Sequence, residues 1–238
     1  MAVVTRSIDY EHDGVALRGY CAWDDSVTGP RPGVLVSHAW AGRSPFEDGK
    51  AEWLASLGYV GFALDNYGAG VLGSSAEENE ALMTPLVQDR PKLQARLLAA
   101  LATLKAQPEV DAGRTAIMGF CFGGLCALDL ARIDADISAA ISIHGLFIPP
   151  GNTAASIRSP ILVLHGWDDP MAKPDSVLAL ADELKAAGAD WQLVAYGQTL
   201  HAFTNPEAND PGFGTVYSAS ADRRSHQAIE NFLAECFD

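Results

Sequence analysis

The stretch Gly119-Phe120-Cys121-Phe122-Gly123-Gly124 lies between two segments with different structural preferences. Residues 115–118 before it are a short β-like run, and residues 125–131 after it have the composition of a helix. A strand, a sharp glycine-flanked turn and a helix are the context of a nucleophile elbow, here with cysteine in the G-x-nucleophile-x-G pattern. The glycines suit this turn, because its backbone is strained and neighbouring segments approach too closely for side chains. The pattern also predicts that the Cys121 sulfur lies at the N-terminus of a helix, an environment that activates thiols.

Outside the elbow, short apolar runs alternate with helical patterns along the whole chain. The predicted strands are residues 3–10, 15–23, 34–37, 59–64, 115–118, 137–143, 161–164 and 191–196. The predicted helices are residues 45–57, 91–106, 125–131, 174–187 and 217–234. The first two strands flank Asp13-Gly14, a hairpin signal, and are expected to form an antiparallel edge. This order predicts one domain over residues 1–238, with a mostly parallel, doubly wound sheet of about seven to eight strands flanked by helices.

In such a sheet, ligands bind beyond the carboxyl ends of the strands. Cys121, Asp169 and His201 all fall just past predicted strand ends. Their order in the chain, nucleophile then acid then histidine, is that of the α/β-hydrolase fold. The sequence therefore predicts an α/β-hydrolase domain with these three residues as a catalytic triad.

The charge and cysteine content of the chain indicate which classes of partner and which cellular compartment to expect. The 238 residues carry a formal net charge of −14, which argues against nucleic acid or an anionic membrane as a partner. The sequence shows no apolar run of transmembrane length and no apolar signal-peptide core at its start. Its four cysteines have no CxxC spacing, so a working thiol in a reducing cytoplasm is expected.

Three longer motifs extend the pattern. They are the elbow itself, His165-Gly166-Trp167-Asp168-Asp169-Pro170 and His201-Ala202-Phe203-Thr204-Asn205-Pro206. With these motifs, and with Asp65-Asn66-Tyr67-Gly68 after an earlier strand, the chain resembles the dienelactone hydrolase family over nearly its whole length. The resemblance implies Cys121 as nucleophile, His201 as base and Asp169, rather than its neighbour Asp168, as the triad acid.

Two positions depart from the family pattern. Family members that act on dienelactone resemble one another in a glutamate after the third strand, where this chain has Ala39. They also carry an arginine four residues after the catalytic histidine, where this chain has Asn205. For a second carboxylate-binding arginine of the family, Arg90 and Arg96 are the nearest candidates. The resemblance therefore implies the fold and the triad, but not the dienelactone substrate.

The expected reaction is hydrolysis of small activated esters or lactones through a thioacyl-enzyme intermediate. Backbone N–H groups of Phe122 and Trp40 are expected to bind the oxyanion. The predicted substrate pocket contains Ala39, Trp167, Phe203 and Asn205. The protein is expected to act on small molecules as a monomer or homodimer, without a cofactor.

Several alternatives stay open. The same triad could act on other neutral electrophiles such as phosphotriesters, or the chain could be a non-catalytic ligand-binding protein. His38, His144 and His165 each follow a strand, but no HxH or HExxH spacing indicates a metal site. A redox pair of Cys121 and Cys126 is a further alternative. Residues 69–90 are interpreted as irregular and acidic, forming either a lid or wall of the site or a solvated excursion.

Overall fold

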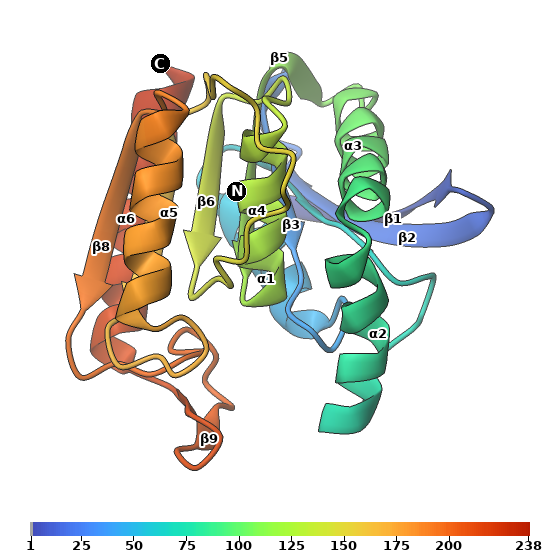
Figure 1. Ribbon diagram of the computed structural model, residues 1–238. Helices are drawn as coiled ribbons and strands as arrows, with labels where there is room; N and C mark the ends of the chain where they lie inside the picture. The colour runs from blue at the N-terminus through green and yellow to red at the C-terminus, as the bar shows by residue number, and fades with distance from the viewer. Residues whose placement is uncertain (1) are drawn as a thin grey trace.

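The computed structural model describes residues 2–238, which build a central eight-stranded sheet with helices on both faces (Figure 1). The strands lie in the order β1-β2-β4-β3-β5-β6-β7-β8. Their bounds are β1 Val3–His12, β2 Val15–Asp24, β3 Arg31–Ser37, β4 Val60–Ala63, β5 Val110–Phe120, β6 Ala139–Ile143, β7 Ile161–Gly166 and β8 Trp191–Tyr196. This is the predicted α/β architecture, with the strand count at the upper end of the expected range.

The sheet is parallel except at one edge. β1 pairs with β2, and β2 with β4, in antiparallel fashion, whereas every other neighbouring pair is parallel. Asp13 and Gly14 join β1 to β2 with φ angles of 55° and 71°. Two successive positive φ values are what a tight two-residue hairpin needs, which explains the Asp-Gly pair at this position. The predicted antiparallel edge is therefore confirmed.

Two hydrophobic cores cover the two faces of the sheet. On one face, α3 (Arg90–Lys105), α4 (Phe122–Arg132) and α5 (Pro174–Ala186) contribute side chains such as Leu93, Leu128 and Leu180. On the other face, α1 (Pro45–Ser56) and α6 (Ala219–Phe237) contribute side chains such as Leu54 and Phe232. Figure 1 shows these two helical layers in front of the sheet and behind it. Because both faces are covered, inner strands such as β4 and β6 are buried along their whole length.

The structure differs from the sequence prediction in two segments. Residues 69–90 are not irregular throughout, because they contain α2 (Ala76–Gln88), which begins at an N-cap formed by Ser75. The prediction of an irregular segment was therefore wrong for most of it. A small antiparallel pair, β9 (Asn209–Asp210) and β10 (Thr215–Val216), was also not predicted. Both segments project from the same end of the sheet (Figure 1).

Elsewhere, the observed ends of helices and strands differ from the predicted ends by a few residues. β5 begins five residues earlier than predicted, and α6 runs from Ala219 to Phe237 rather than over 217–234. In the part of the chain that the structure describes, no helix combines the length and the apolar character needed to cross a membrane.

Candidate active site

Cys121 lies in a sharp turn between β5 and α4, with a φ of 56° and a ψ of −114°. This backbone conformation is rare for a residue with a side chain. A Cβ at Gly119 would lie 2.1 Å from the carbonyl oxygen of Gly123, and one at Gly123 would lie 2.1 Å from that of Ser37. The strand and helix can pack this closely only because both positions are glycine, so the turn geometry explains the G-x-C-x-G spacing.

The carboxyl ends of the strands bring Asp169 to His201. The two side chains join through His201 Nδ1 and Asp169 Oδ2, which are 2.6 Å apart, and each is 2% exposed. The other carboxylate oxygen of Asp169 accepts a hydrogen bond from the Met171 N–H at 2.8 Å. Its neighbour Asp168 is exposed. Asp169 is thus the carboxylate that orients the imidazole.

The far nitrogen of His201 is free to face the cysteine. Among residues 2–238, His201 Nε2 is buried and has no hydrogen-bond partner. Burial alone would lower the pKa of His201. The negative charges of Cys121 and Asp169 and the hydrogen bond to Asp169 outweigh it and raise the pKa to about 10. At neutral pH this pKa favours the protonated imidazole beside Cys121.

Two backbone N–H groups beside Cys121 are unpaired among the residues that the structure describes. Phe122 is the first residue of α4, so its N–H has no intrahelical acceptor. The N–H of Trp40 also donates no hydrogen bond. Tyr67 fixes the Trp40 loop, because its hydroxyl donates to the Trp40 carbonyl at 2.9 Å. Both N–H groups are therefore available to donate to a bound molecule.

His38 holds the preceding peptide of the same loop. The Asn66 N–H donates to His38 Nε2 at 3.1 Å, so the ring hydrogen is on Nδ1. That nitrogen donates to the Ala39 carbonyl at 2.6 Å. Burial lowers the pKa of His38 and keeps the ring neutral. Both ring nitrogens of His38 are thus hydrogen-bonded to the backbone, so neither is available to bind a ligand.

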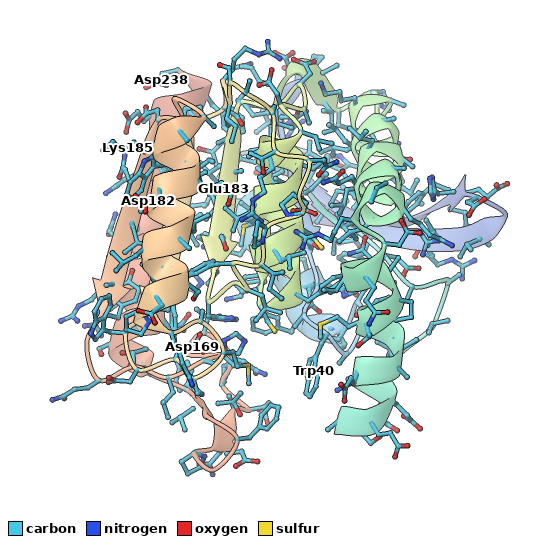
Figure 2. All side chains as sticks on the ribbon, in the orientation of Figure 1. Trp40, Asp169, Asp182, Glu183, Lys185 and Asp238 are labelled. Carbon is cyan, nitrogen blue, oxygen red and sulfur yellow. The ribbon has the colours of Figure 1, made fainter. Side chains whose placement is uncertain are left out.

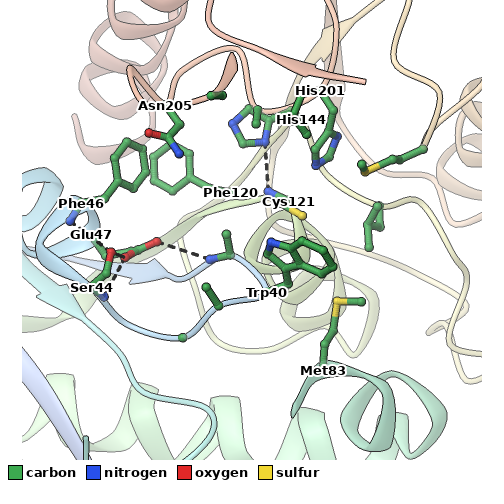
Figure 3. Close-up of a pocket in the computed structure, with 18 of the residues that line it drawn as sticks. Trp40, Ser44, Phe46, Glu47, Met83, Phe120, Cys121, His144, His201 and Asn205 are labelled. Atoms are coloured by element: carbon green, nitrogen blue, oxygen red, sulfur yellow. Dashed lines mark hydrogen bonds between the residues drawn. The ribbon is translucent and has the colours of Figure 1, made fainter. Parts of the chain in front are cut away.

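A cavity of about 360 Å³ opens above Cys121 and is mostly apolar (Figure 3). Its apolar wall includes Trp40, Phe46, Met83, Phe120, Leu146 and Phe213. The indole of Trp40 stacks on the Phe213 ring, with centroids 5.6 Å apart and planes 19° apart. Met83 comes from α2 and Phe213 from the turn between β9 and β10. α2 and the β9–β10 turn, two elements that the sequence did not predict, therefore form walls of the site.

The cavity contains one carboxylate that sequence reasoning missed. Glu47 is 2% exposed and lines the cavity from the first turn of α1. The N–H and hydroxyl of Ser44 donate to its Oε2 at 2.9 and 2.7 Å, and the Ala39 N–H points to its Oε1 at 3.4 Å. Ser44 and Glu47 form a capping box, and the S-x-x-E spacing was the available signal. None of the lining residues that the structure describes is lysine or arginine.

Two of the four predicted pocket residues lie elsewhere. Ala39 and Asn205 line the cavity. Trp167 does not, and its side chain is 46% exposed. Phe203 is fully buried in the core, against the rings of Tyr196 and His144. Both predictions used nearness to a catalytic residue in sequence, which does not determine where a loop side chain points.

The two candidate arginines also lie outside the cavity. Arg90 Nε donates to the Asp129 carboxylate at 2.7 Å, and a second guanidinium nitrogen contacts the other carboxylate oxygen. Arg96 Nη1 donates to the Asn66 carbonyl at 2.6 Å. Neither lines the cavity, and both guanidinium groups are held by protein acceptors.

The overall placement of the site follows from the sheet. Trp40 and Asp169 lie at the edge toward which the strands point, while Asp238 lies at the opposite edge (Figures 1 and 2). In residues 2–238, no group of three or more His, Cys, Asp or Glu side chains is arranged to hold a metal ion. The four cysteines are free thiols, and Cys126, within α4, is fully buried.

Comparison with known proteins places this site in a family. The model of the dienelactone hydrolase family matches residues 17–237. The chain belongs to the dienelactone hydrolase family. It is therefore a hydrolase that acts on ester or lactone bonds.

Individual relatives agree with this assignment. An uncharacterized protein of Caenorhabditis elegans is 39% identical over 150 residues, which cover 61% of this chain and 95% of that protein. A Yersinia pestis protein with the provisional name carboxymethylenebutenolidase is 28% identical, over 80% of this chain and 75% of its own. The crystal structure of a dienelactone hydrolase-like promiscuous phosphotriesterase from metagenomic libraries superposes with a TM-score of 0.94. It is 36% identical, and the match covers 100% of both chains.

Proposed function

We propose that this family member hydrolyses small, neutral, activated carboxylic esters or lactones through Cys121, His201 and Asp169. The observation that supports the triad is the 2.6 Å hydrogen bond between His201 and Asp169 at the end of the sheet where the cysteine elbow lies. The free Nε2 of His201 is the atom that exchanges a proton with the substrate.

Acylation begins with the thiolate of Cys121. The sulfur forms a bond to the carbonyl carbon, and the carbonyl electron pair moves onto the oxygen. The N–H groups of Phe122 and Trp40 stabilise this oxyanion. When the intermediate collapses, the bond to the leaving oxygen breaks, and the imidazolium of His201 donates its proton to that oxygen. A thioester on Cys121 and a free alcohol result.

In deacylation His201 must act as a base, and formation of the thioester lowers its pKa so that it can. The negative charge of Cys121 is the largest of the effects that raise the pKa of His201. Acylation removes that charge, so the pKa of the imidazole falls. Neutral His201 then takes a proton from water as its oxygen attacks the thioester carbon. The carbon–sulfur bond breaks, the acid leaves, and the thiolate with its imidazolium is restored.

The charges that line the cavity indicate neutral substrates. Ala39 and Asn205 stand where the family pattern has a glutamate and a carboxylate-binding arginine. Glu47 supplies a buried carboxylate, and the described lining contains no lysine or arginine. A substrate carboxylate in this cavity would therefore meet the like charge of Glu47 with no lysine or arginine in the described lining to pair with. This is the basis for proposing uncharged esters rather than an anionic dienelactone.

The test compares wild type with Cys121→Ala on p-nitrophenyl acetate, p-nitrophenyl butyrate and a dienelactone. We expect the neutral esters to be preferred and the variant to lose turnover of all three. Electrospray mass spectrometry of enzyme quenched during turnover should show one acyl group on the Cys121 peptide. Turnover that survives in Cys121→Ala would contradict the triad, and preferred turnover of the dienelactone would contradict the substrate class.

A second candidate activity is cleavage of neutral aryl phosphotriesters. Its support is the 36% identical phosphotriesterase with a TM-score of 0.94, together with a cavity whose described lining contains no lysine or arginine. The thiolate would form a sulfur–phosphorus bond as the aryloxide leaves, and water would then cleave that bond. Ala39→Glu adds a second negative charge to the cavity and should lower this activity. Unchanged phosphotriester turnover and pH dependence in Ala39→Glu would count against the candidate.

A further inference from the structure

A second buried histidine contacts the nucleophile elbow directly, although it lies outside the triad. His144 follows β6, is 2% exposed and has a φ of 37°. The backbone N–H of Cys121 donates to His144 Nδ1 at 3.1 Å (Figure 3). On the other side of the ring, His144 Nε2 lies 2.9 Å from Thr204 Oγ1. Thr204 is 2% exposed and does not line the cavity.

The backbone decides which ring nitrogen of His144 carries the hydrogen. The N–H of Cys121 can only donate, so Nδ1 must be an acceptor without a hydrogen. Nε2 therefore carries the hydrogen and donates it to the Thr204 hydroxyl oxygen. Without the Thr204 hydroxyl, Nε2 would no longer need a hydrogen, so the tautomer with its hydrogen on Nδ1 could also form. In that tautomer the Nδ1–H group would face the N–H of Cys121, and neither could accept a hydrogen bond from the other.

We propose that His144 and Thr204 are positioning residues that hold the strained Cys121 elbow in its reactive geometry. Thr204 fixes the His144 tautomer, and His144 in turn accepts from the Cys121 backbone. This inference concerns the site of the proposed function and rests on Cys121 being its nucleophile.

These hydrogen bonds connect the Cys121 elbow to the loop that carries His201, and the reaction needs the two to keep their relative positions. The Cys121 N–H also donates to the Ile143 carbonyl at 3.0 Å, so β6 and its following residue hold the elbow at two acceptors. Thr204 lies three residues after His201, in the loop that carries the catalytic imidazole. The hydrogen bonds that join Cys121, His144 and Thr204 thus run beside His201, whose ring centroid lies 5.1 Å from that of His144.

Protonation of His144 would break this link, and its surroundings prevent protonation. Burial and the charge of His201, whose ring centroid lies 5.1 Å away, keep the pKa of His144 well below its usual value. Lys50 adds a smaller effect in the same direction. His144 therefore remains a neutral acceptor even while the neighbouring His201 carries its proton.

The experiment uses four single variants of the whole chain. Thr204→Val removes the hydroxyl and keeps the shape, and Thr204→Ser keeps the hydroxyl. His144→Asn places an amide oxygen where Nδ1 was, on a residue type that tolerates a positive φ. Thr115→Val is the matched control, because the buried hydroxyl of Thr115 has no hydrogen-bond partner among residues 2–238.

Two readouts are measured at neutral pH. One is kcat/KM for p-nitrophenyl butyrate, and the other is the rate of Cys121 alkylation by iodoacetamide, followed by peptide mass spectrometry. We expect Thr204→Val to lower both by about tenfold or more, the range for an unmade buried hydrogen bond. Thr204→Ser should recover most of that loss, and Thr115→Val should change neither readout. ¹⁵N NMR of wild type should show His144 Nδ1 without a hydrogen.

A double variant separates positioning from packing. In His144→Asn the side chain at 144 needs no tautomer, so adding Thr204→Val should have little further effect. An equal loss from Thr204→Val in both backgrounds, or equal rates in Thr204→Val and Thr204→Ser, would overturn the proposal. Failure of the proposed function looks different, because turnover would then survive in Cys121→Ala.

Discussion

Among the residues that the structure describes, Glu47 is the only carboxylate that lines the cavity, and replacing it with glutamine removes that group. Glutamine has nearly the same shape, and its amide oxygen can still accept from the N–H and hydroxyl of Ser44. The weaker contact with the Ala39 N–H, at 3.4 Å, would be lost. The main change is therefore one of charge within the substrate cavity.

The size of the effect follows from the cavity volume. A sphere of 360 Å³ is roughly 9 Å across, so a substrate carboxylate inside it lies within about 9 Å of Glu47. At an effective dielectric constant of about 20, two negative charges at that distance repel by about 1.8 kcal/mol. This corresponds to a factor of about 20 in rate or binding. Glu47→Gln should raise kcat/KM for an anionic ester by at least this factor relative to a neutral one.

The assay uses two esters of the same leaving group, p-nitrophenyl butyrate and mono-p-nitrophenyl succinate, which differ by a carboxylate. A substitution that merely shifts the loop should lower kcat/KM for both esters equally, so the ratio of the two kcat/KM values reports only the effect of the substrate charge. Glu52→Gln is the control, because Glu52 is exposed on the same helix and does not line the cavity. An unchanged ratio in Glu47→Gln, or an equal change in Glu52→Gln, would show that Glu47 does not set the charge preference.

Three further predictions concern the triad and the scaffold. Asp169→Asn should lower kcat for p-nitrophenyl butyrate by about a thousand- to ten-thousandfold, because an amide N–H facing Nδ1 favours the wrong tautomer of His201; folded protein with near wild-type kcat would refute this. His201 should lose its proton near pH 10 in an NMR titration. In Cys121→Ala that midpoint should move to lower pH, because the negative charge that stabilises the imidazolium is gone; an unmoved midpoint would contradict the ion pair. Arg90→Met should lower the free energy of unfolding in urea by about 3–5 kcal/mol, because the fully buried Asp129 loses its bidentate partner. The folded variant should keep its esterase activity, and a stability equal to wild type would contradict the importance of this ion pair.

Much of the fold could be predicted because local chemistry and global architecture agree. Buried parallel strands are continuous apolar runs, and the Asp13-Gly14 turn has the backbone angles its sequence suggests. The placement of Cys121, Asp169 and His201 at one edge of the sheet was predictable for a similar reason, since all three follow strand ends. The elbow glycines mark a close contact of backbone with backbone, which no other residue type allows.

What could not be predicted depends on contacts between segments far apart in the chain. α2 was missed because Pro85 lies inside it and glycine and serine precede it, a composition more typical of a loop. Trp167 and Phe203 are neighbours of the triad in sequence, yet one is exposed and the other joins the core. Glu47 gave only a capping signal, and nothing local showed that its carboxylate would also face the substrate.

The walls of the cavity have a different origin from its floor. Cys121 stands on the central sheet, while Met83 comes from α2 and Phe213 from the turn between β9 and β10. Neither excursion belongs to the central sheet, although Leu86 of α2 joins a core and the β9–β10 turn holds the His201 backbone through Gly214 and Val216. Selection for a new acyl group could therefore act on the cavity-facing side chains of these excursions while the sheet that carries Cys121 stays inherited. For protein engineering, libraries confined to positions such as Met83 and Phe213 should change selectivity at the lowest risk to folding.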